Sequence, residues 1–367
     1  MVERQDRIFA LAAHVFGKCS RWVLEGSVVK IEYHSDLKEV QLGGELVRLL
    51  SAECQSAPFD RLAWWDGLGK HCEMAPTLAV ARDGEALAVL ALTGGAGHYC
   101  ALANWYTFRF RPILSPAPES AALLAELAGD LAGKAHRLTL TGLPDEDGSA
   151  SRVEAAFRKA GWLVTREPSD TNHILPVAGR RYEEYLQGRP GQLRTTLKRK
   201  TKKVRVEILT RFDETVWSAY EDIYAESWKP EEGSPAFLRA FAEAEGAAGR
   251  LRLGVAYAAD DPSHPIAAQM WTVEGGTAFI HKLAHREAAK PLSPGSVLSA
   301  ALFRHVIDVD RVELVDFGTG DDPYKRDWME AVRPRYRLEM FRPLDLRNWL
   351  VFARIGLRRL AATAKRG

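Results

Sequence analysis

The chain has 367 residues, of which 46% are hydrophobic and 27% charged, enough apolar material for about two globular domains. Its 50 basic and 48 acidic residues nearly cancel, which argues against a DNA-binding protein coated with basic side chains. The four cysteines form no CxxC pair, and no stretch approaches 18 uncharged apolar residues, so neither a metal site nor a membrane-spanning helix is expected.

Strand-like and helical patterns alternate along the first half. The turn at Asp83-Gly84 predicts a hairpin, and Gly161 is placed to end a helix. The acids near the N-terminus are unlike a secretory signal, so a cytoplasmic protein with reduced thiols is expected. We expect strands over 27–33, 136–143 and 162–168, the hairpin over 77–94, and helices over 43–54, 59–72, 118–133 and 151–161.

The second half repeats this order of elements. Three consecutive strands, a helix, a strand, a short helix and a last strand follow a basic helical segment, a strand over 204–210 and two further helices. The two halves therefore look like two copies of one mixed α/β fold. The expected ranges are 182–204, 213–227 and 234–246 for the first helices, 250–260, 265–275 and 277–285 for the strands, and 294–308, 311–317, a turn from Pro323 and 336–343 for the rest.

One motif lies at the predicted start of the 294–308 helix. The sequence "SPGS" (293–296) puts Pro294 in the first helical turn, where its missing N–H costs nothing. Gly295 lets a ligand approach the backbone, and the free amides and helix dipole favour an anion such as a pyrophosphate. The same residues also fit an ordinary serine cap, so both interpretations remain open here.

A second motif, "VDFGTGDDPYKRDW" (315–328), follows an apolar strand. Ligands of open α/β sheets tend to bind beyond the carboxyl ends of strands. Asp321 and Asp322 can cap the next helix, which puts Lys325 in its first turn, where a cation opposes the helix dipole and needs a partner. The alternative is a solvated turn in which Lys325 pairs with an aspartate.

Two basic segments complete the pattern. In "RTTLKRKTKKVR" (194–205), Arg194 and Lys198 share one helix face, and Arg199 lies on another. So many basic side chains in one segment suit the binding of phosphate groups, although an ordinary solvated helix face fits the pattern equally well. The tail over 346–367 mixes arginines with Trp349 and other apolar residues, so it lies on a membrane surface, docks on its own domain or frays.

Together these stretches closely resemble the C-terminal half of the bacterial GNAT acyltransferases grouped with the cellulose-biosynthesis protein CelD. The resemblance rests on the run from 267 to 328, on the basic segment and on "ESWK" (226–229), and it covers about 170–341. It reaches the first half loosely through "NWYTFRFRPIL" (104–114). More distantly, Tyr324-Lys325 before Trp328 is similar to the phenylalanine-lysine pattern of the Fem aminoacyltransferases, tandem GNAT folds that use charged tRNA.

The resemblance implies a tandem GNAT-like α/β fold with mixed sheets. Its expected parts are a degenerate lobe over 1–170, an acyltransferase lobe over 171–345 and the basic tail over 346–367. It further implies acetyl-CoA or another acyl-CoA as co-substrate and no metal. Only Gly295 represents the usual glycine-rich loop, which puts acetyl-CoA itself in question. The residues carried over as donor-binding are Lys282, Ser293, Pro294, Gly295 and Ser296, and those carried over as acceptor-binding are Arg194, Lys198, Arg199, Trp228, Gln269, Asp316 and Gly318.

For the chemistry, Tyr324 is the expected acid toward the leaving sulfur, and Lys325 stabilises developing charge or holds a phosphate. Asp321 is the first choice for the base and His285 the second. The expected acceptor is a small molecule or saccharide, such as an envelope-polysaccharide precursor, with peripheral contact at the inner membrane through the tail. Two rivals remain: a Fem-type transferase that uses aminoacyl-tRNA, and a non-catalytic scaffold for polysaccharide assembly. The sequence does not give the oligomeric state.

Overall fold

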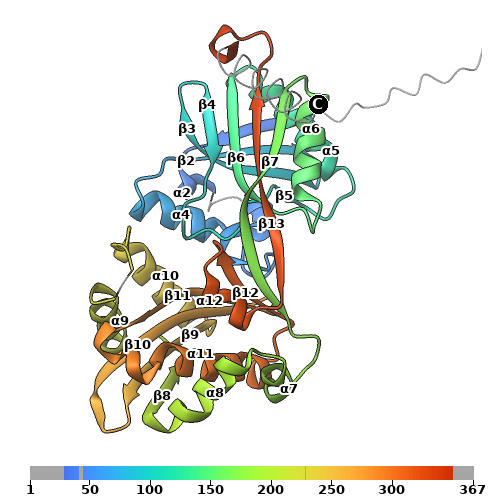
Figure 1. Ribbon diagram of the computed structural model, residues 1–367. Coiled ribbons are helices and arrows are strands. Elements are labelled where there is room, and N and C mark those ends of the chain that lie inside the picture. The colour runs from blue at the N-terminus through green and yellow to red at the C-terminus, as the bar shows by residue number, and fades with distance from the viewer. Residues whose placement is uncertain (1–28, 41–43, 228, 350–367) are drawn as a thin grey trace, which may run out of the picture.

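The computed structural model describes residues 29–40, 44–227 and 229–349. Within these residues one mixed sheet of 13 strands runs through the molecule, and helices cover its faces (Figure 1). The strand order along the sheet is β1-β2-β3-β4-β6-β13-β7-β12-β11-β10-β9-β8, with β5 paired to β3.

The first half contains most of the predicted elements. Gly84 and Gly161 both take positive φ, at the hairpin turn and just after a helix as expected. The strands are β1 (Lys30–His34), β2 (Pro76–Asp83), β3 (Ala86–Gly95), β4 (His98–Ala101), β5 (Ile113–Leu114), β6 (Arg137–Leu143) and β7 (Leu163–Pro176). The helices are α2 (Leu37–Val40), α3 (Gly44–Leu49), α4 (Leu62–His71), α5 (Ser120–Leu131) and α6 (Ser149–Lys159).

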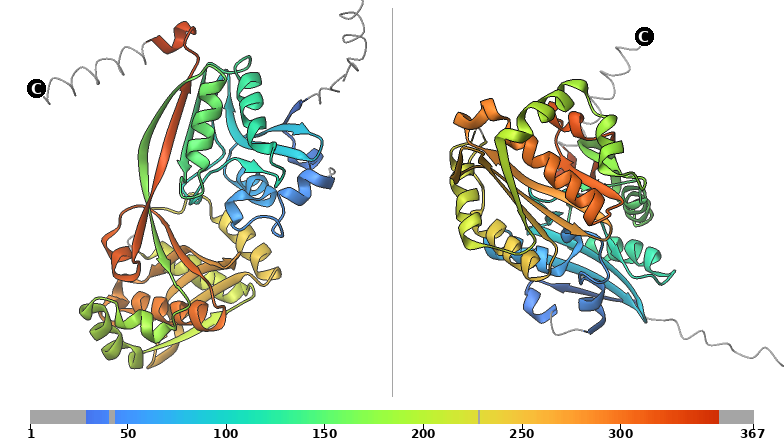
Figure 2. Two further views of the ribbon diagram at one scale, coloured as in Figure 1. Left: turned by 90° about the vertical axis from the view of Figure 1, so that its right-hand side faces the viewer. Right: turned by 90° about the horizontal axis from the view of Figure 1, so that it is seen from below.

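The second half confirms the predicted order of three antiparallel strands, helix, strand, helix and strand. Its strands are β8 (Val204–Leu209), β9 (Leu251–Ala258), β10 (Asp261–Glu274), β11 (Thr277–His285), β12 (Leu314–Thr319) and β13 (Ala331–Phe341). Its helices are α7 (Tyr182–Gln187), α8 (Gly191–Lys200), α9 (Glu214–Ala225), α10 (Pro235–Ala247), α11 (Pro294–Arg304) and α12 (Pro323–Trp328). In the view from below, α11 crosses the face of the second-half strands (Figure 2).

Both halves contain one parallel strand pair in an otherwise antiparallel arrangement. In the first half β4 pairs with β6 in parallel, and in the second half β11 pairs with β12 in parallel. In each case a helix, α5 or α11, connects the two parallel strands. The halves therefore share one topology, as the order of elements in the sequence predicts.

Two long strands join the halves. β13 pairs with β7 along its whole length, and its C-terminal part also pairs with β6 of the first half. Conversely, the C-terminal part of β7 pairs with β12 of the second half. Each half is thus completed by a strand from the other. Residue 170, the expected domain boundary, lies within β7, and the proposed division into domains stays a prediction.

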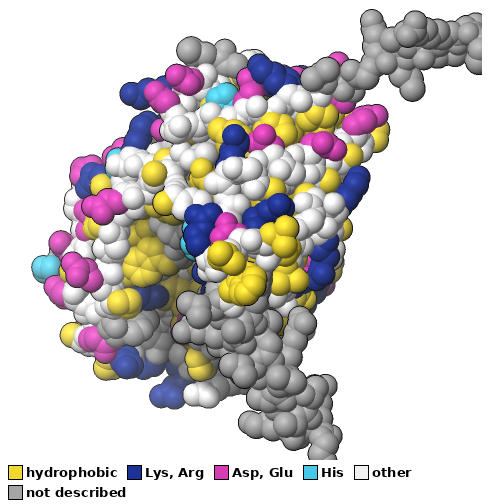
Figure 3. Space-filling model, turned by 90° about the horizontal axis from the view of Figure 1, so that it is seen from above, with side chains coloured by type: hydrophobic (Ala, Val, Ile, Leu, Met, Phe, Trp, Pro, Cys, Tyr) yellow, Lys and Arg dark blue, Asp and Glu magenta, His cyan; other side chains and the backbone are white. Residues whose placement is uncertain are grey.

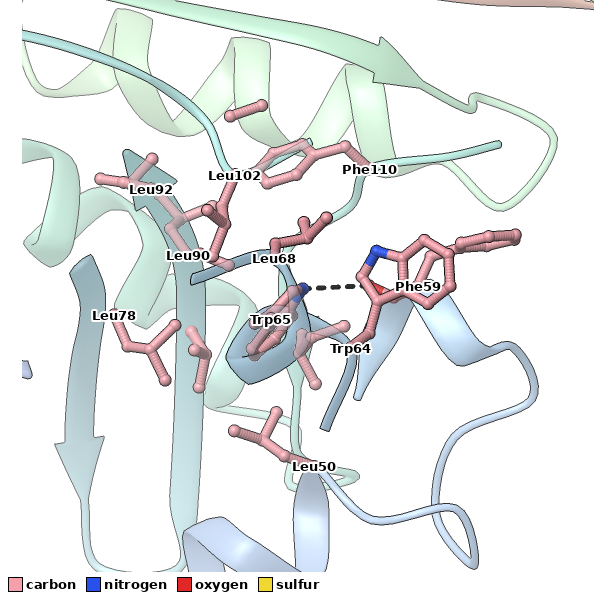
Figure 4. Close-up of a cluster of buried hydrophobic side chains, with 14 of the residues drawn as sticks. Leu50, Phe59, Trp64, Trp65, Leu68, Leu78, Leu90, Leu92, Leu102 and Phe110 are labelled. Atoms are coloured by element: carbon pink, nitrogen blue, oxygen red, sulfur yellow. Dashed lines mark hydrogen bonds between the residues drawn. The ribbon is translucent and has the colours of Figure 1, made fainter. Parts of the chain in front are cut away.

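Two clusters of buried hydrophobic side chains hold the layers together. The larger one packs α4 and α5 against β2 and β3 and extends to α9 and α10. Figure 4 shows the part of it around Trp65. Within it Trp65 donates its indole N–H to the carbonyl oxygen of Phe59 at 3.0 Å, so its one polar atom is satisfied. Burial of each large side chain contributes about 1.5–3 kcal/mol. The second cluster lies between α7, α8, α11 and the second-half strands.

Candidate functional site

The site begins where β11 and β12 separate. These strands pair only from Thr277 to Phe279, opposite Leu314 to Asp316, and both continue beyond that ladder. A cavity of about 430 Å³ lies on one side of the opening and one of about 190 Å³ on the other. Leu283, Phe317 and Tyr324 line both. The Tyr324 side chain therefore borders both cavities.

The start of α11 borders the larger of these cavities, which we call the donor cavity. Gly295 and Ser296 line it, and Pro294 occupies the first helical turn, as predicted. Ser293 has φ +52°, the left-handed conformation that glycine favours, so this turn forms without a second glycine. The first amides of an 11-residue helix have no intrahelical acceptor. This end can hold an anion.

Gln269 fixes the position of that helix. It is buried on β10 and donates from Nε2 to Gly295 O at 3.1 Å and to Ser299 Oγ at 2.8 Å. Its Oε1 accepts from Trp271 Nε1 at 3.0 Å. Gln269, expected to bind the acceptor, instead lines the donor cavity and holds the α11 terminus against the sheet.

Tyr324 lies in the first turn of α12, edge-on to Phe317 with ring centroids 5.6 Å apart. Burial, with a smaller contribution from the charge of Asp322, raises the pKa of Tyr324 above its ordinary value. The phenol therefore keeps its proton at neutral pH. It has the position and the protonation state that a general acid requires.

Lys325 is buried. A cation in the first turn of a helix opposes the helix dipole and needs a partner, and Lys325 has one. Its ammonium donates to the backbone carbonyls of Thr319 and Gly320 and lies 3.9 Å from an Asp322 oxygen. Burial lowers the pKa of Lys325. The prediction that Asp322 caps this helix is wrong in one respect. Asp322 occupies the N-cap position, but its side chain makes no capping hydrogen bond. Lys325 thus ties the loop after β12 together while lining the smaller cavity.

Asp316 and Gly318 shape that loop. The Asp316 carboxylate accepts from Asn172 Nδ2 at 2.7 Å, from the Gly318 amide at 2.8 Å and from Arg333 Nη2 at 3.1 Å. Gly318 has φ +68°, and a Cβ there would lie 2.9 Å from the Phe108 ring. Only glycine fits, and Asp316 contacts protein groups from three strands.

The two base candidates lie in different surroundings. The Asp321 side chain is exposed, pairs with Arg326, lies 3.2 Å from His173 Nε2, and lines neither cavity. Arg326 is the main cause of its lowered pKa. His285 lines the donor cavity, and burial lowers its pKa below the ordinary value. His285 is therefore neutral at pH 7 and able to accept a proton.

Lys282 faces the smaller cavity, on the side opposite to the α11 terminus. Its Nζ donates to Glu232 Oε1 at 2.7 Å and lies 4.9 Å from the Trp105 ring centroid and 4.6 Å from that of Tyr106. The structure therefore does not bring it together with Ser293 and Gly295. Glu232, Trp105 and Tyr106 were missed by sequence reasoning, although the last two lie in the "NWYTFRFRPIL" stretch of the first half.

The basic helix α8 borders the donor cavity. Its buried Leu193 lines that cavity, while Arg194, Lys198 and Arg199 are exposed. Trp228, expected to bind the acceptor, lies outside the described residues, as does the tail from 350 onward.

Three exposed apolar side chains lie at or just before the described start of the tail, namely Leu344, Leu346 and Trp349. On the face seen from above, hydrophobic side chains gather in patches, and charges of both signs are interspersed around them (Figure 3). Across the described residues no His, Cys, Asp and Glu cluster could hold a metal. Nor is any helix in this part long and apolar enough to cross a membrane.

Comparison with known proteins agrees with this geometry. Residues 191–326 match the family model described as acetyltransferase (GNAT) domain. No curated protein sequence matches significantly. The structure of FemX is similar at TM-score 0.56, with 11% identity over 83% of this chain and 96% of that one. A C-terminal DUF2156 domain from Agrobacterium fabrum, described as part of a lysylphosphatidylglycerol synthetase, follows at TM-score 0.53, with 11% identity over 80% and 90%.

At these identities the similarity of the structures establishes the fold alone. A tandem GNAT protein from the clavulanic acid biosynthesis pathway is 14% identical over 87% of this chain and 100% of that one, but its TM-score of 0.49 is too low to add weight. The residues that match the family model include most of those that line the donor cavity and most of α12. The predicted mixed α/β, GNAT-like fold is confirmed.

Proposed function

We propose that this protein, whose residues 191–326 match a GNAT acetyltransferase domain, is an acyltransferase that moves an acyl group from a coenzyme A thioester to an amine or hydroxyl. The observation that carries the proposal is the pair of cavities that Tyr324 borders. A donor and an acceptor can reach the same tyrosine from opposite sides of the β11–β12 opening.

The residues of the donor cavity fit a thioester with a diphosphate. The α11 amides and the nearby ammonium of Lys290 would bind the diphosphate, and the opening between the strands would admit the acyl-bearing arm. Leu193, Leu283 and Phe317 supply apolar wall for that arm. The exposed cations of α8 lie beside the same cavity and suit further phosphate.

In the reaction, the acceptor nitrogen or oxygen attacks the thioester carbonyl carbon, and the carbon–sulfur bond breaks. The acceptor's proton goes to His285, directly or through water, and Tyr324 protonates the leaving sulfur. Lys325 lies next along α12 and adds positive charge near the developing oxyanion. The resemblance to the CelD group points to an envelope-polysaccharide precursor as one class of acceptor.

The test is Tyr324→Phe, with Tyr257→Phe on strand β9 as the matched control. Loss of the acid should lower kcat by about 10²-fold, because general acid catalysis contributes about that much. The dissociation constant of acetyl-CoA, measured by calorimetry, should stay within about twofold. Unchanged turnover in Tyr324→Phe would remove this tyrosine from the mechanism. Absence of thioester turnover and of acyl-CoA binding in the wild type would favour the scaffold instead.

A second candidate is transfer from aminoacyl-tRNA. The exposed Arg194, Lys198 and Arg199 beside the donor cavity favour it, because such cations bind nucleic-acid phosphates. It predicts binding of tRNA that weakens steeply with salt and turnover of an aminoacyl-tRNA but not of an acyl-CoA. Thermal-shift measurements with acetyl-CoA and deacylated tRNA at two salt concentrations separate the two donors.

A further inference from the structure

Exposed apolar side chains gather where β13 ends. Among the described residues, Leu344 and Leu346 are the most exposed large apolar side chains, at 93% and 73%, and Trp349 is 60% exposed. Leu163 is also exposed, and it pairs with the last residue of β13, so it lies at the same end of the molecule. Figure 1 shows this end on the far side of the first half from the second-half helices. We call residues 342–349 the tip.

Hydrogen bonds within the tip fix its backbone. The Asp345 amide donates to the Arg342 carbonyl oxygen at 3.3 Å, which closes a turn with Pro343 at its second position, where a fixed φ is suitable. The Asp345 carboxylate accepts from the Arg347 amide at 3.0 Å and caps the short 3₁₀ helix Leu346–Asn348. The leucines of the tip are therefore held in solvent by an ordered segment.

The side chain of Asn348 attaches the tip to the first half. It is buried, and its Nδ2 donates to the carbonyl oxygen of His136 at 2.8 Å and to that of Arg342 at 3.0 Å. The Arg342 amide donates to the same His136 oxygen at 2.9 Å. Apolar surface that a fixed backbone keeps in water is unfavourable in the free protein, and such a patch marks an interaction surface.

The tip and the residues that follow it also differ in charge from the rest of the chain. Residues 342–367 contain seven of the 50 basic residues and only one of the 48 acidic residues, Asp345. Because the whole chain has a net charge of +2, residues 1–341 are net acidic. In the sequence, residues 350–367 continue the mixture of arginine with leucine, valine, isoleucine and phenylalanine. Positive charge is thus concentrated at the end of the chain that exposes apolar side chains.

A hollow of about 450 Å³ beside the tip brings some of these cations together. Lys134, Arg342 and Arg347 line it, together with Asp345. Asp345 accepts two hydrogen bonds from the Arg347 guanidinium, and Lys134 lies 3.7 Å from an Asp130 oxygen. Both pairs lie at the surface, where an ion pair contributes little, so phosphate groups can approach these cations.

We propose that the tip docks on the surface of a bilayer that contains anionic phospholipid. Leu344, Leu346 and Trp349 enter the boundary between head groups and acyl chains, and the basic side chains of residues 342–367 lie among the lipid phosphates. Tryptophan suits this depth because its ring is apolar and its N–H is polar. The inference uses no residue that lines the cavities at Tyr324, so it is independent of the proposed acyl transfer.

Co-sedimentation of the full-length protein with vesicles tests the proposal. One set of vesicles is pure phosphatidylcholine, and the other contains equal parts of phosphatidylcholine and phosphatidylglycerol. The partition coefficient should be at least about tenfold higher on the anionic vesicles, and added salt should weaken the binding because it screens surface charge. Equal binding to both sets, or binding to neither, overturns the inference.

Two double variants assign the contact to the tip. Leu344→Ser combined with Leu346→Ser removes two apolar side chains and should lower the partition coefficient on the anionic vesicles by about tenfold or more. The matched control is Val309→Ser combined with Val332→Ser, at two second-half positions that are 65% and 61% exposed, and it should leave the coefficient unchanged. Binding that survives the leucine variant contradicts the assigned surface.

A second copy of the chain is the other partner that an apolar tip could take. Sedimentation equilibrium without lipid measures the oligomeric state of the wild type and of the leucine variant. The same state in both proteins supports the bilayer as the occupant. A wild-type dimer that dissociates in the leucine variant assigns the tip to self-association and overturns the inference.

Discussion

Tyr324 and Lys325 are neighbours in sequence, and the structure gives them different surroundings. Tyr324 lines both cavities, whereas Lys325 lines one and bonds to two carbonyls of its own loop. The sequence could predict that a cation in this turn needs a partner. It could not predict which partner, because the loop conformation depends on Asp316 meeting Asn172 and Arg333 from distant strands.

The sequence and the structure differ most in which residue they favour as the general base. Sequence reasoning ranked Asp321 first and His285 second. We predict that His285→Asn lowers kcat by about 10²-fold, whereas Asp321→Asn changes it by less than about threefold, since its carboxylate lines neither cavity. Steady-state kinetics of the two variants checks this. The reverse ranking would restore Asp321 as the base.

His281 gives a pH dependence of stability. Its pKa is about 3 in the fold, lowered by burial, against an ordinary 6.5, so between these values the unfolded chain binds more protons and stability falls as pH falls. Between pH 7.5 and 5 the loss from this group is about 2 kcal/mol. In His281→Gln, urea unfolding should show a correspondingly smaller change over this interval. An identical change in both proteins would contradict this account.

At the scale of elements, the sequence predicted most helices and strands but not the contacts that Lys282 makes with Glu232 and Trp105. The strand β11 also contains a bulge: Met270 pairs with Lys282 and Trp271 with Ile280, which leaves His281 without a ladder partner. Strand residues normally alternate between faces, and a bulge breaks the alternation. No local pattern in "TAFIHKLAH" reveals it.

Arg61 joins three elements by buried charge. Preceding α4, it donates to Glu245 of α10 at 2.9 Å and also to Glu274 of β10, whose pKa burial raises to about 7. Arg61→Ala leaves two buried carboxylates without this partner and should lower the free energy of unfolding by about 3 kcal/mol at pH 8. Lys70→Ala, which breaks an exposed pair on α4, should cost less than about 1 kcal/mol.

Chemical denaturation of both variants at pH 8 and pH 5 checks the Arg61 network. The cost of Arg61→Ala should shrink at pH 5, because Glu274 can then take up a proton in the fold. A cost equal to that of Lys70→Ala at both pH values would show that the network adds nothing.

At the scale of the whole molecule, the order of elements indicated two copies of one fold but not how they are joined. Each copy is completed by β7 or β13 of the other, through pairings between residues more than 130 positions apart. Sequence patterns report local periodicity, so they contain no signal for such an exchange. The hydrogen bond between Tyr106 and Glu232 escaped prediction for the same reason, since it joins the two halves of the chain.

This exchange predicts that neither half folds alone. A fragment of residues 1–176 keeps β6 and β7 but lacks β13, which pairs with both. Two strand edges would then be unpaired, and the fragment should show no cooperative thermal unfolding by circular dichroism. A fragment that melts cooperatively, as the full chain should, would show that the halves are independent.

Hydrogen exchange with and without acetyl-CoA tests the central claim most directly, namely that a thioester binds where α11 begins and reaches Tyr324. The account predicts slower amide exchange over 293–299 and 317–328 when acetyl-CoA is present, with no change in α5 of the first half. Protection confined to other segments, or none at saturating acetyl-CoA, would contradict it.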